Sequence, residues 1–201
     1  MPRAGLTPDL VIDTAAMIAD EGGMRAVTLA AIAERAGVKP PSLYKHVDGL
    51  DAIERGLALR GLREANVRII RATIGLQGEE ALVALAKAYW RFSYEHPGLY
   101  EATLRAPRPG ETDIEEAGGI LVGMVATVLE GFGLRGDDAL HAVRGVRAIV
   151  HGFVSLNAAG GFGLALNVEE SFVRLVRSFA RGLADEPAAK APPRRLKLGG
   201  R

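Results

Sequence analysis

The sequence of 201 residues contains no cysteine, which excludes disulfide frameworks, thiolate zinc sites and cysteine nucleophiles. No apolar run reaches the roughly 18 residues of a membrane span, and the N-terminal residues lack the apolar core of a signal peptide. We therefore expect a cytoplasmic protein with no membrane partner. Aromatic residues make up only 5% of the chain, but 48% hydrophobic and 24% charged residues indicate a globular protein with a sizeable core.

An excess of one charge sign is also missing, because the net charge is only +1. Residues 187–201 carry five basic and no acidic side chains, so the rest of the chain carries a net charge of −4. Binding to nucleic acid would therefore need a local basic patch rather than bulk charge. The end of the chain is rich in proline, alanine and arginine, and we expect residues 185–201 to form a disordered basic tail.

Two short helices joined by a tight turn are predicted for residues 28–47, TLAAIAERAGVKPPSLYKHV. Thr28 is a suitable N-cap for the first helix, and Gly37 can adopt the left-handed conformation that ends it. Ala33 is small enough for a second helix to cross close by, and Leu43 gives that second helix an inward face. This pattern favours a helix-turn-helix, although an ordinary helical hairpin is the alternative from this stretch alone.

The rest of the chain shows helical spacing of apolar residues and no strand-like alternation, so the predicted fold class is all-α with about nine helices. Further helices are expected at residues 8–21, 49–74, 79–95, 98–104, 113–132, 138–159 and 168–183. Asp48, Thr112, Asp137 and Asn167 are expected to cap four of these helices through their side chains.

Residues 7–65 resemble the N-terminal DNA-binding domain of the TetR family of transcriptional regulators. The matching residues are Ala15, Gly22, Thr28, Ile32, Ala33, Ala36, Gly37, Val38, Leu43, Tyr44, His46 and Val47. The resemblance implies a homodimer that places the second motif helix in the major groove of a palindromic double-stranded operator. It also implies three segments, namely a DNA-binding domain (1–65), a ligand-binding and dimerisation domain (66–184) and the basic tail (185–201).

The expected DNA contacts surround the second motif helix. The candidate residues are Thr28, Lys39, Pro40, Pro41, Ser42, Tyr44, Lys45 and His46. Tyr44, Lys45 and His46 are placed for phosphate contacts, whereas Pro41 can offer only apolar contact to a thymine methyl. Ala30 and Pro40 stand where many relatives carry longer polar side chains, so shape readout is expected to contribute more than base hydrogen bonds.

Thr28 and His46 each have a structural alternative. Thr28 can cap its helix alone or also donate a hydrogen bond to a phosphate, and His46 can contact a phosphate or be a packed, hydrogen-bonded ring.

The second half resembles the helical ligand-binding half of this family, with the last two long helices forming a dimer interface. The expected interface residues are Gly145, Ala148, Gly152, Phe172, Leu175 and Phe179. Internal core is the alternative role for these helices. The pair His151-Gly152 resembles the mark of a C-terminal ligand-domain subgroup, although the tryptophan often found before that pair is absent.

A pocket for a small apolar effector is implied between the middle helices. The candidate lining residues are Trp90, Tyr94, Tyr100, Leu104, Met124, Val128, His151 and Phe162, each of which has ordinary core packing as its alternative. No cofactor or metal is expected. The sequence carries no phosphate-binding glycine loop, nucleophile elbow or paired-histidine metal motif, so an all-helical enzyme is the weaker interpretation. A helix-turn-helix protein without any small-molecule effector remains the other alternative, and activation versus repression stays open, with repression the commoner family behaviour.

Overall fold

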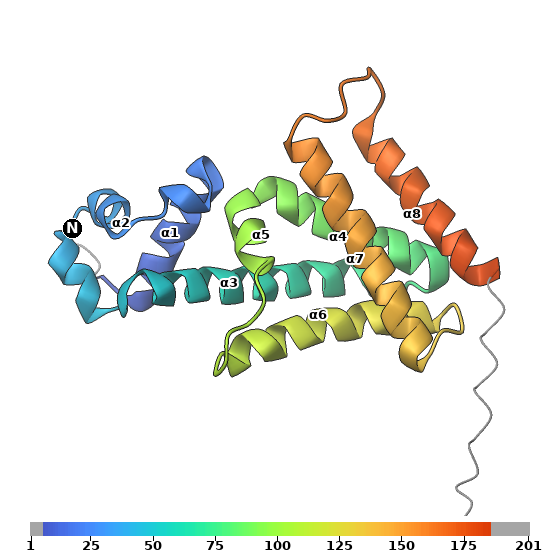
Figure 1. The fold of residues 1–201 in the computed structure, drawn as a ribbon, viewed down its shortest axis with the longest axis horizontal. Coiled ribbons are helices and arrows are strands. Elements are labelled where there is room, and N and C mark those ends of the chain that lie inside the picture. Colours follow the sequence, from blue (N-terminus) through green and yellow to red (C-terminus); the bar gives the residue numbers. More distant parts are fainter. Residues whose placement is uncertain (1–5, 186–201) are drawn as a thin grey trace, which may run out of the picture.

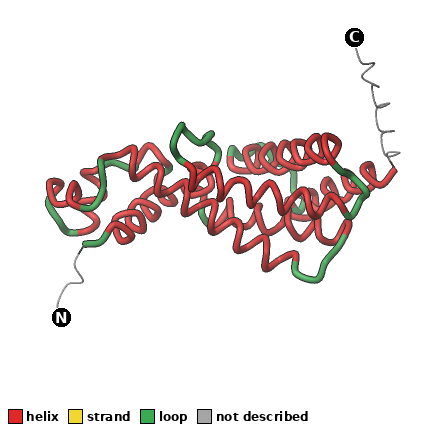
Figure 2. Tube along the Cα trace, turned by 90° about the horizontal axis from the view of Figure 1, so that it is seen from below, coloured by secondary structure: helices red, strands yellow, loops and turns green. Residues whose placement is uncertain are grey.

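The computed structural model describes residues 6–185, and all regular structure in that range is helical (Figures 1 and 2). The elements in chain order are α1 (Pro8–Gly22), the 3-10 turn η1 (Met24–Ala26), α2 (Leu29–Ala36), the 3-10 helix η2 (Pro40–Lys45), α3 (Gly49–Thr73), α4 (Gly78–Glu95), α5 (Pro97–Thr103), α6 (Thr112–Glu130), α7 (Gly136–Ala158) and α8 (Val168–Asp185). The α-helices together with η2 are the nine helices of the predicted all-α fold. The predicted tail lies outside the described residues, apart from the helical end at residue 185.

Local capping explains where the first helices begin and end. Thr7 Oγ1 accepts a hydrogen bond from the Leu10 amide, and Thr28 Oγ1 accepts one from the Ala31 amide at 3.1 Å. Gly37 has φ of 67°, and its amide donates to the Glu34 carbonyl while the Val38 amide donates to the Ala33 carbonyl. These two bonds form a Schellman motif, which turns the chain sharply toward η2.

The second motif helix is a 3-10 helix and not the α-helix that the sequence predicted. Pro40 and Pro41 supply no backbone N–H, and the segment contains only six residues. The missing N–H groups cost little at a helix start, and a segment this short is typical of 3-10 helices.

The 25-residue helix α3 links the two ends of the elongated molecule (Figure 1). At about 1.5 Å per residue it spans roughly 37 Å. Its first half packs against α1, and α5 and α6 pack along it further on. Asn66 in its middle donates to the Ala117 carbonyl of α6 at 2.9 Å. In Figure 1, α7 and α8 lie as a pair at the end opposite α1 and α2.

Helix α5 is fastened to α1 at its N-terminus. Asp20 Oδ1 accepts from the Gly98 and Leu99 amides at 2.9 and 3.2 Å, and Asp20 Oδ2 contacts His96 Nδ1 at 2.9 Å. Gly98 is buried against Ala19 so closely that a Cβ atom there would lie 2.2 Å from the Ala19 carbonyl carbon. The carboxylate of Asp20 thus supplies the cap that α5 lacks in its own sequence.

Three of the four predicted side-chain caps are wrong. Asp48 makes no capping bond, because its ψ of 58° departs from the extended conformation of an N-cap. Thr112 is already the first residue of α6, and Asp137 lies inside the first turn of α7, where its charge still favours the helix dipole. The fourth prediction is confirmed, because Asn167 Oδ1 accepts from the Glu170 amide at 2.8 Å.

Among residues 6–185, no helix is both long and apolar enough to cross a membrane.

Candidate functional site

The η2 helix presents most of its side chains to solvent and holds one in the core. Leu43 is fully buried, whereas Tyr44 is 60% exposed and Lys39 and Lys45 are also exposed. Neither lysine forms an ion pair within the described part of the chain. The segment therefore offers two unneutralised cations and a phenol on one short outward-facing element, as phosphate binding requires.

The other candidate DNA contacts lie within η2 or next to it. Pro40, Pro41 and Thr28 are exposed, while Ser42 and His46 are partly buried. Backbone bonds from the Ser42 amide to the Lys39 carbonyl and from the His46 amide to the Leu43 carbonyl hold the helix in shape. Arg35 is close by in sequence, but Glu21 neutralises it through two hydrogen bonds of 2.5 Å.

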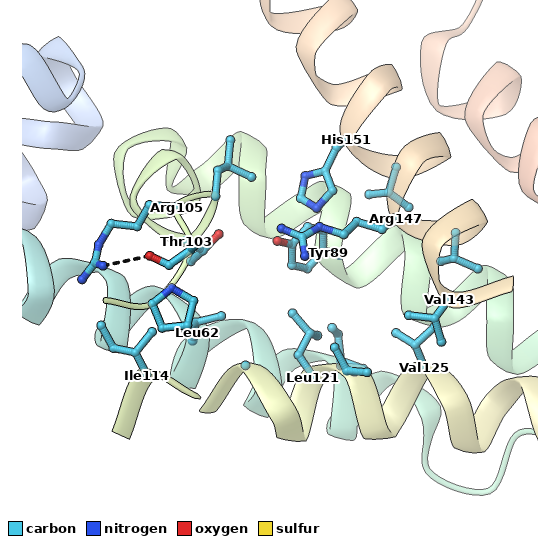
Figure 3. A pocket seen from close by; sticks show the side chains of 18 of the residues that line it. Leu62, Tyr89, Thr103, Arg105, Ile114, Leu121, Val125, Val143, Arg147 and His151 are labelled. Atoms are coloured by element: carbon cyan, nitrogen blue, oxygen red, sulfur yellow. Dashed lines mark hydrogen bonds between the residues drawn. The ribbon is translucent and has the colours of Figure 1, made fainter. Parts of the chain in front are cut away.

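A cavity of about 450 Å³ lies between α3, α4, α6 and α7, with the α5–α6 connection on one side (Figure 3). This volume falls in the range of roughly 300–1,000 Å³ that small-molecule sites occupy. Most of its wall is aliphatic. The lining residues are Leu62, Ile69, Leu85, Tyr89, Thr103, Leu104, Arg105, Ala106, Pro107, Ile114, Glu115, Gly118, Leu121, Val122, Val125, Val143, Val146, Arg147, Val150 and His151.

One group of polar side chains surrounds His151. His151 Nδ1 lies 2.7 Å from the Tyr100 hydroxyl, and the two rings stack with their centroids 5.6 Å apart. Burial, with a smaller contribution from the Arg147 charge, lowers the pKa of His151 to about 4. Burial also raises the pKa of Tyr89 and Tyr100 above the ordinary tyrosine value. All three rings are therefore neutral near pH 7.

Of the eight predicted ligand residues, the structure brings Leu104 and His151 to the cavity wall. Tyr100 lies behind His151 as its hydrogen-bond partner. The others lie elsewhere. Trp90 packs on Phe153 and Phe172, Phe162 packs on Phe153, Tyr94 is 77% exposed, and Met124 and Val128 are partly buried on α6 without lining the cavity.

Sequence reasoning missed Tyr89 and Arg147. A signal for Arg147 was present, because Val143, Arg147 and His151 are spaced four residues apart and so share one face of α7. Arg147 is exposed, so it lies where this face of α7 meets both the cavity and solvent.

The candidate interface residues divide into surface and interior positions. Ala148, Gly152 and Leu175 are exposed. Phe172 is fully buried, and Gly145 lies under the Phe179 ring, where a Cβ atom would approach Phe179 to 2.9 Å. Phe172, Gly145 and Phe179 thus join α7 and α8 within one protomer.

A helix-turn-helix at one end and a helical domain around a cavity at the other define a two-part DNA-binding regulator. The family model described as "Bacterial regulatory proteins, tetR family" matches residues 11–46, and that described as "Tetracyclin repressor-like, C-terminal domain" matches residues 82–179. The chain is 38% identical over 183 residues to the "Uncharacterized HTH-type transcriptional regulator YobS" of Bacillus subtilis (strain 168), covering 90% of this chain and 95% of YobS. The chain therefore belongs to the TetR family of transcriptional regulators, a family without enzymatic activity.

Solved structures share the fold at low identity. The transcriptional regulator SCO7222, a TetR from Streptomyces coelicolor, matches with a TM-score of 0.70 and 18% identity, over 90% of this chain and 98% of that one. A TetR variant from Acinetobacter baumannii AYE in complex with minocycline matches with a TM-score of 0.66 and 22% identity, over 89% of this chain and 96% of that one.

Proposed function

We propose that this regulator is a repressor that acts in the cytoplasm, binds a palindromic operator as a homodimer and is released by a small apolar molecule. The observation that carries the effector part is the cavity together with its connection to α3. We place the boundary between the DNA-binding and effector domains near residue 65, inside α3. Assignment of the effector domain to the His-Gly subgroup stays a prediction, supported by His151 at the cavity wall.

The DNA-binding part rests on η2. Lys39, which precedes η2, and the first residues of η2, Pro40, Pro41 and Ser42, would face base edges in the major groove. Tyr44, Lys45 and His46 would hold phosphates on either side. With two prolines and one short hydroxyl at the reading positions, base hydrogen bonds are few. Groove shape and thymine methyl contacts would therefore supply much of the selectivity.

The connection between α5 and α6, residues 104–111, joins the cavity to α3. Leu104, Arg105 and Pro107 of this connection line the cavity. Arg105 is held by two bonds to Glu111, of 2.6 and 2.8 Å, and Glu111 also accepts from the Arg108 amide. The connection is thus a small rigid unit, and a ligand that displaced its cavity side would move its other side as well.

That other side contacts the start of α3. The Arg108 guanidinium lies 3.5 Å from Asp51 and 3.7 Å from Glu54, and Arg55 bonds Asp113 at 2.5 Å. The first turns of α3 directly follow η2 in the chain. We infer that ligand binding shifts these turns, so that the two η2 helices of a dimer no longer match successive major grooves, roughly 34 Å apart.

The dimer part rests on the outer surface of α7 and α8. Ala148, Gly152 and Leu156 form an exposed stripe along α7 at four-residue spacing, and Leu175 is 40% exposed on α8. A Cβ atom on Gly152 would meet nothing within 4 Å, so this position leaves room for close approach of a partner helix. A four-helix contact between two copies would cover this surface.

Binding of the purified protein to a labelled duplex from its own upstream region, against a scrambled duplex over a range of salt, tests this proposal. Tight and selective binding that weakens on addition of a cavity ligand is expected. Selective binding that no cavity ligand changes would instead favour the alternative of a regulator without an effector. A reporter driven by the bound promoter then separates repression from activation.

A further inference from the structure

The cavity is chemically asymmetric, with an aliphatic body and a polar end. Leu62, Ile69, Leu85, Leu121, Val125 and Val143 form the body, and they come from α3, α4, α6 and α7. Figure 3 shows the side chains of His151, Arg147 and Tyr89 together on the side of the cavity opposite Leu121. A ligand filling this space would therefore be apolar along most of its length and polar at one end.

The polar end offers hydrogen-bond donors. The raised pKa of Tyr100 keeps its hydroxyl protonated, and this hydroxyl lies 2.7 Å from His151 Nδ1. In the tautomer of neutral His151 that carries its proton on Nε2, the Tyr100 hydroxyl donates to Nδ1, and no residue within 6–185 accepts from Nε2. In that tautomer the ring, which lines the cavity, offers it a hydrogen-bond donor.

Arg147, an exposed residue that also lines the cavity, adds a positive charge on the same side. Its charge lowers the pKa of His151, Tyr89 and Tyr100. For the two tyrosines burial has the larger effect and raises the pKa. Within residues 6–185 Arg147 forms neither an ion pair nor a hydrogen bond. A guanidinium has five donors and no acceptor, so its natural partner is an anion with several acceptor oxygens.

The other charged groups at the cavity do not satisfy Arg147. Arg105 is paired with Glu111. Glu115 also lines the cavity, but no ion pair joins it to Arg147 or to any other described residue. The Glu115 carboxylate would attract a cationic ligand and the Arg147 guanidinium an anionic one, so the two residues predict ligands of opposite charge.

We propose that the effector is an anionic amphiphile, with its apolar chain in the aliphatic body and its carboxylate or similar acid group held by Arg147 and the His151 Nε2–H. This inference rests on the proposed function, because it names the class of molecule that the effector cavity takes. Two donors, one of them charged, account for the preference over a neutral or cationic headgroup.

Calorimetry of the full chain without DNA tests the ligand class with three probes of equal chain length, decanoate, decan-1-ol and decyltrimethylammonium. Decanoate is expected to bind at least tenfold more tightly than the other two. Arg147→Gln should remove at least tenfold of the decanoate affinity and leave the decanol affinity unchanged, and Arg147→Lys should restore part of it. Arg144→Gln, an exposed arginine on the same helix outside the cavity, is the matched control and should bind like the wild type.

The inference is overturned if decanol or the ammonium probe binds as tightly as decanoate, if Arg147→Gln leaves decanoate binding unchanged, or if no probe binds. Addition of decanoate to the complex with a bound duplex tests the ligand class separately from the proposed release of DNA. Decanoate that binds through Arg147 without releasing the duplex would uphold the ligand class and contradict the proposed release mechanism.

Discussion

Replacing Gly98 by alanine is expected to destabilise the protein, because this residue packs directly against the backbone of Ala19 where α5 meets α1. The added Cβ would lie 2.2 Å from the Ala19 carbonyl carbon and 2.5 Å from the Ala19 oxygen. Favourable contacts between carbon atoms need about 3.5–4.0 Å, so the overlap exceeds 1 Å. The atoms it meets belong to the backbone and cannot rotate away, and α1 and α5 must therefore separate.

The cost has two parts. Overpacking of a core position costs roughly 1–3 kcal/mol. Separation of the helices also lengthens the bonds from the Gly98 and Leu99 amides to Asp20, and loss of such a cap costs about 1 kcal/mol. The sum is about 2–4 kcal/mol, which for a domain of this size lowers the melting temperature by roughly 4–16 °C.

Gly119→Ala is the matched control, because Gly119 is exposed within α6 and an added Cβ would meet nothing within 4 Å. Alanine is favoured over glycine by about 0.8–1.0 kcal/mol inside a helix, so this variant should melt slightly above the wild type. Urea and thermal unfolding at equal protein concentration measure both changes. A Gly98→Ala protein that is as stable as the wild type would refute the close packing of α1 on α5.

Three further predictions concern DNA contact, acid stability and assembly. Lys45→Ala should weaken binding to all duplexes similarly and reduce the slope of log affinity against log salt by about one, which titrations at several salt concentrations measure; a loss confined to one base pair would contradict a phosphate contact. Hydrogen bonds from Arg105 and Arg108 lower the pKa of Glu111 to about 2, so its ionised form stabilises the fold above about pH 4.5 and that contribution is lost as the pH falls toward 2. Urea midpoints of the wild type and Glu111→Gln should therefore differ above pH 4.5 and converge in acid, and a difference that does not vary with pH would count against the ion pair. Gly152→Glu should leave the monomer fold intact but break the dimer, because it places a charge at the centre of the α7 stripe; an unchanged sedimentation coefficient would contradict this interface.

The local sequence was enough to predict most helices. Helix α2 begins after Thr28 and ends before Gly37 as expected, because the capping preferences of these residues depend on bonds within a few residues of each. Asp20 shows the limit of such reasoning, since it caps α5 from 78 residues away and no local pattern marks it. The predicted caps at Asp48 and Thr112 failed for local reasons, because Asp48 is not extended and because α6 begins at Thr112 itself.

The cavity was harder to predict than the helix-turn-helix. Aromatic residues were natural candidates for its wall, but Trp90 is taken up by the packing of α4 against Phe172 of α8, with centroids 5.4 Å apart. Whether an aromatic ring fills a core or lines a cavity depends on the crossing of helices far apart in sequence. Arg147 could have been found from its position one turn before His151, because both lie on the face of α7 that carries Val143.

Selection of bound duplexes from a random-sequence library tests the central claim most directly, namely that η2 of each protomer in a dimer recognises one half of an operator. The account predicts enrichment of an inverted repeat whose half-sites lie about one helical turn, or a multiple of it, apart, and a changed half-site in Pro41→Ala, which loses the thymine methyl contact. Enrichment of no sequence, or of a single site without two-fold symmetry, would contradict it.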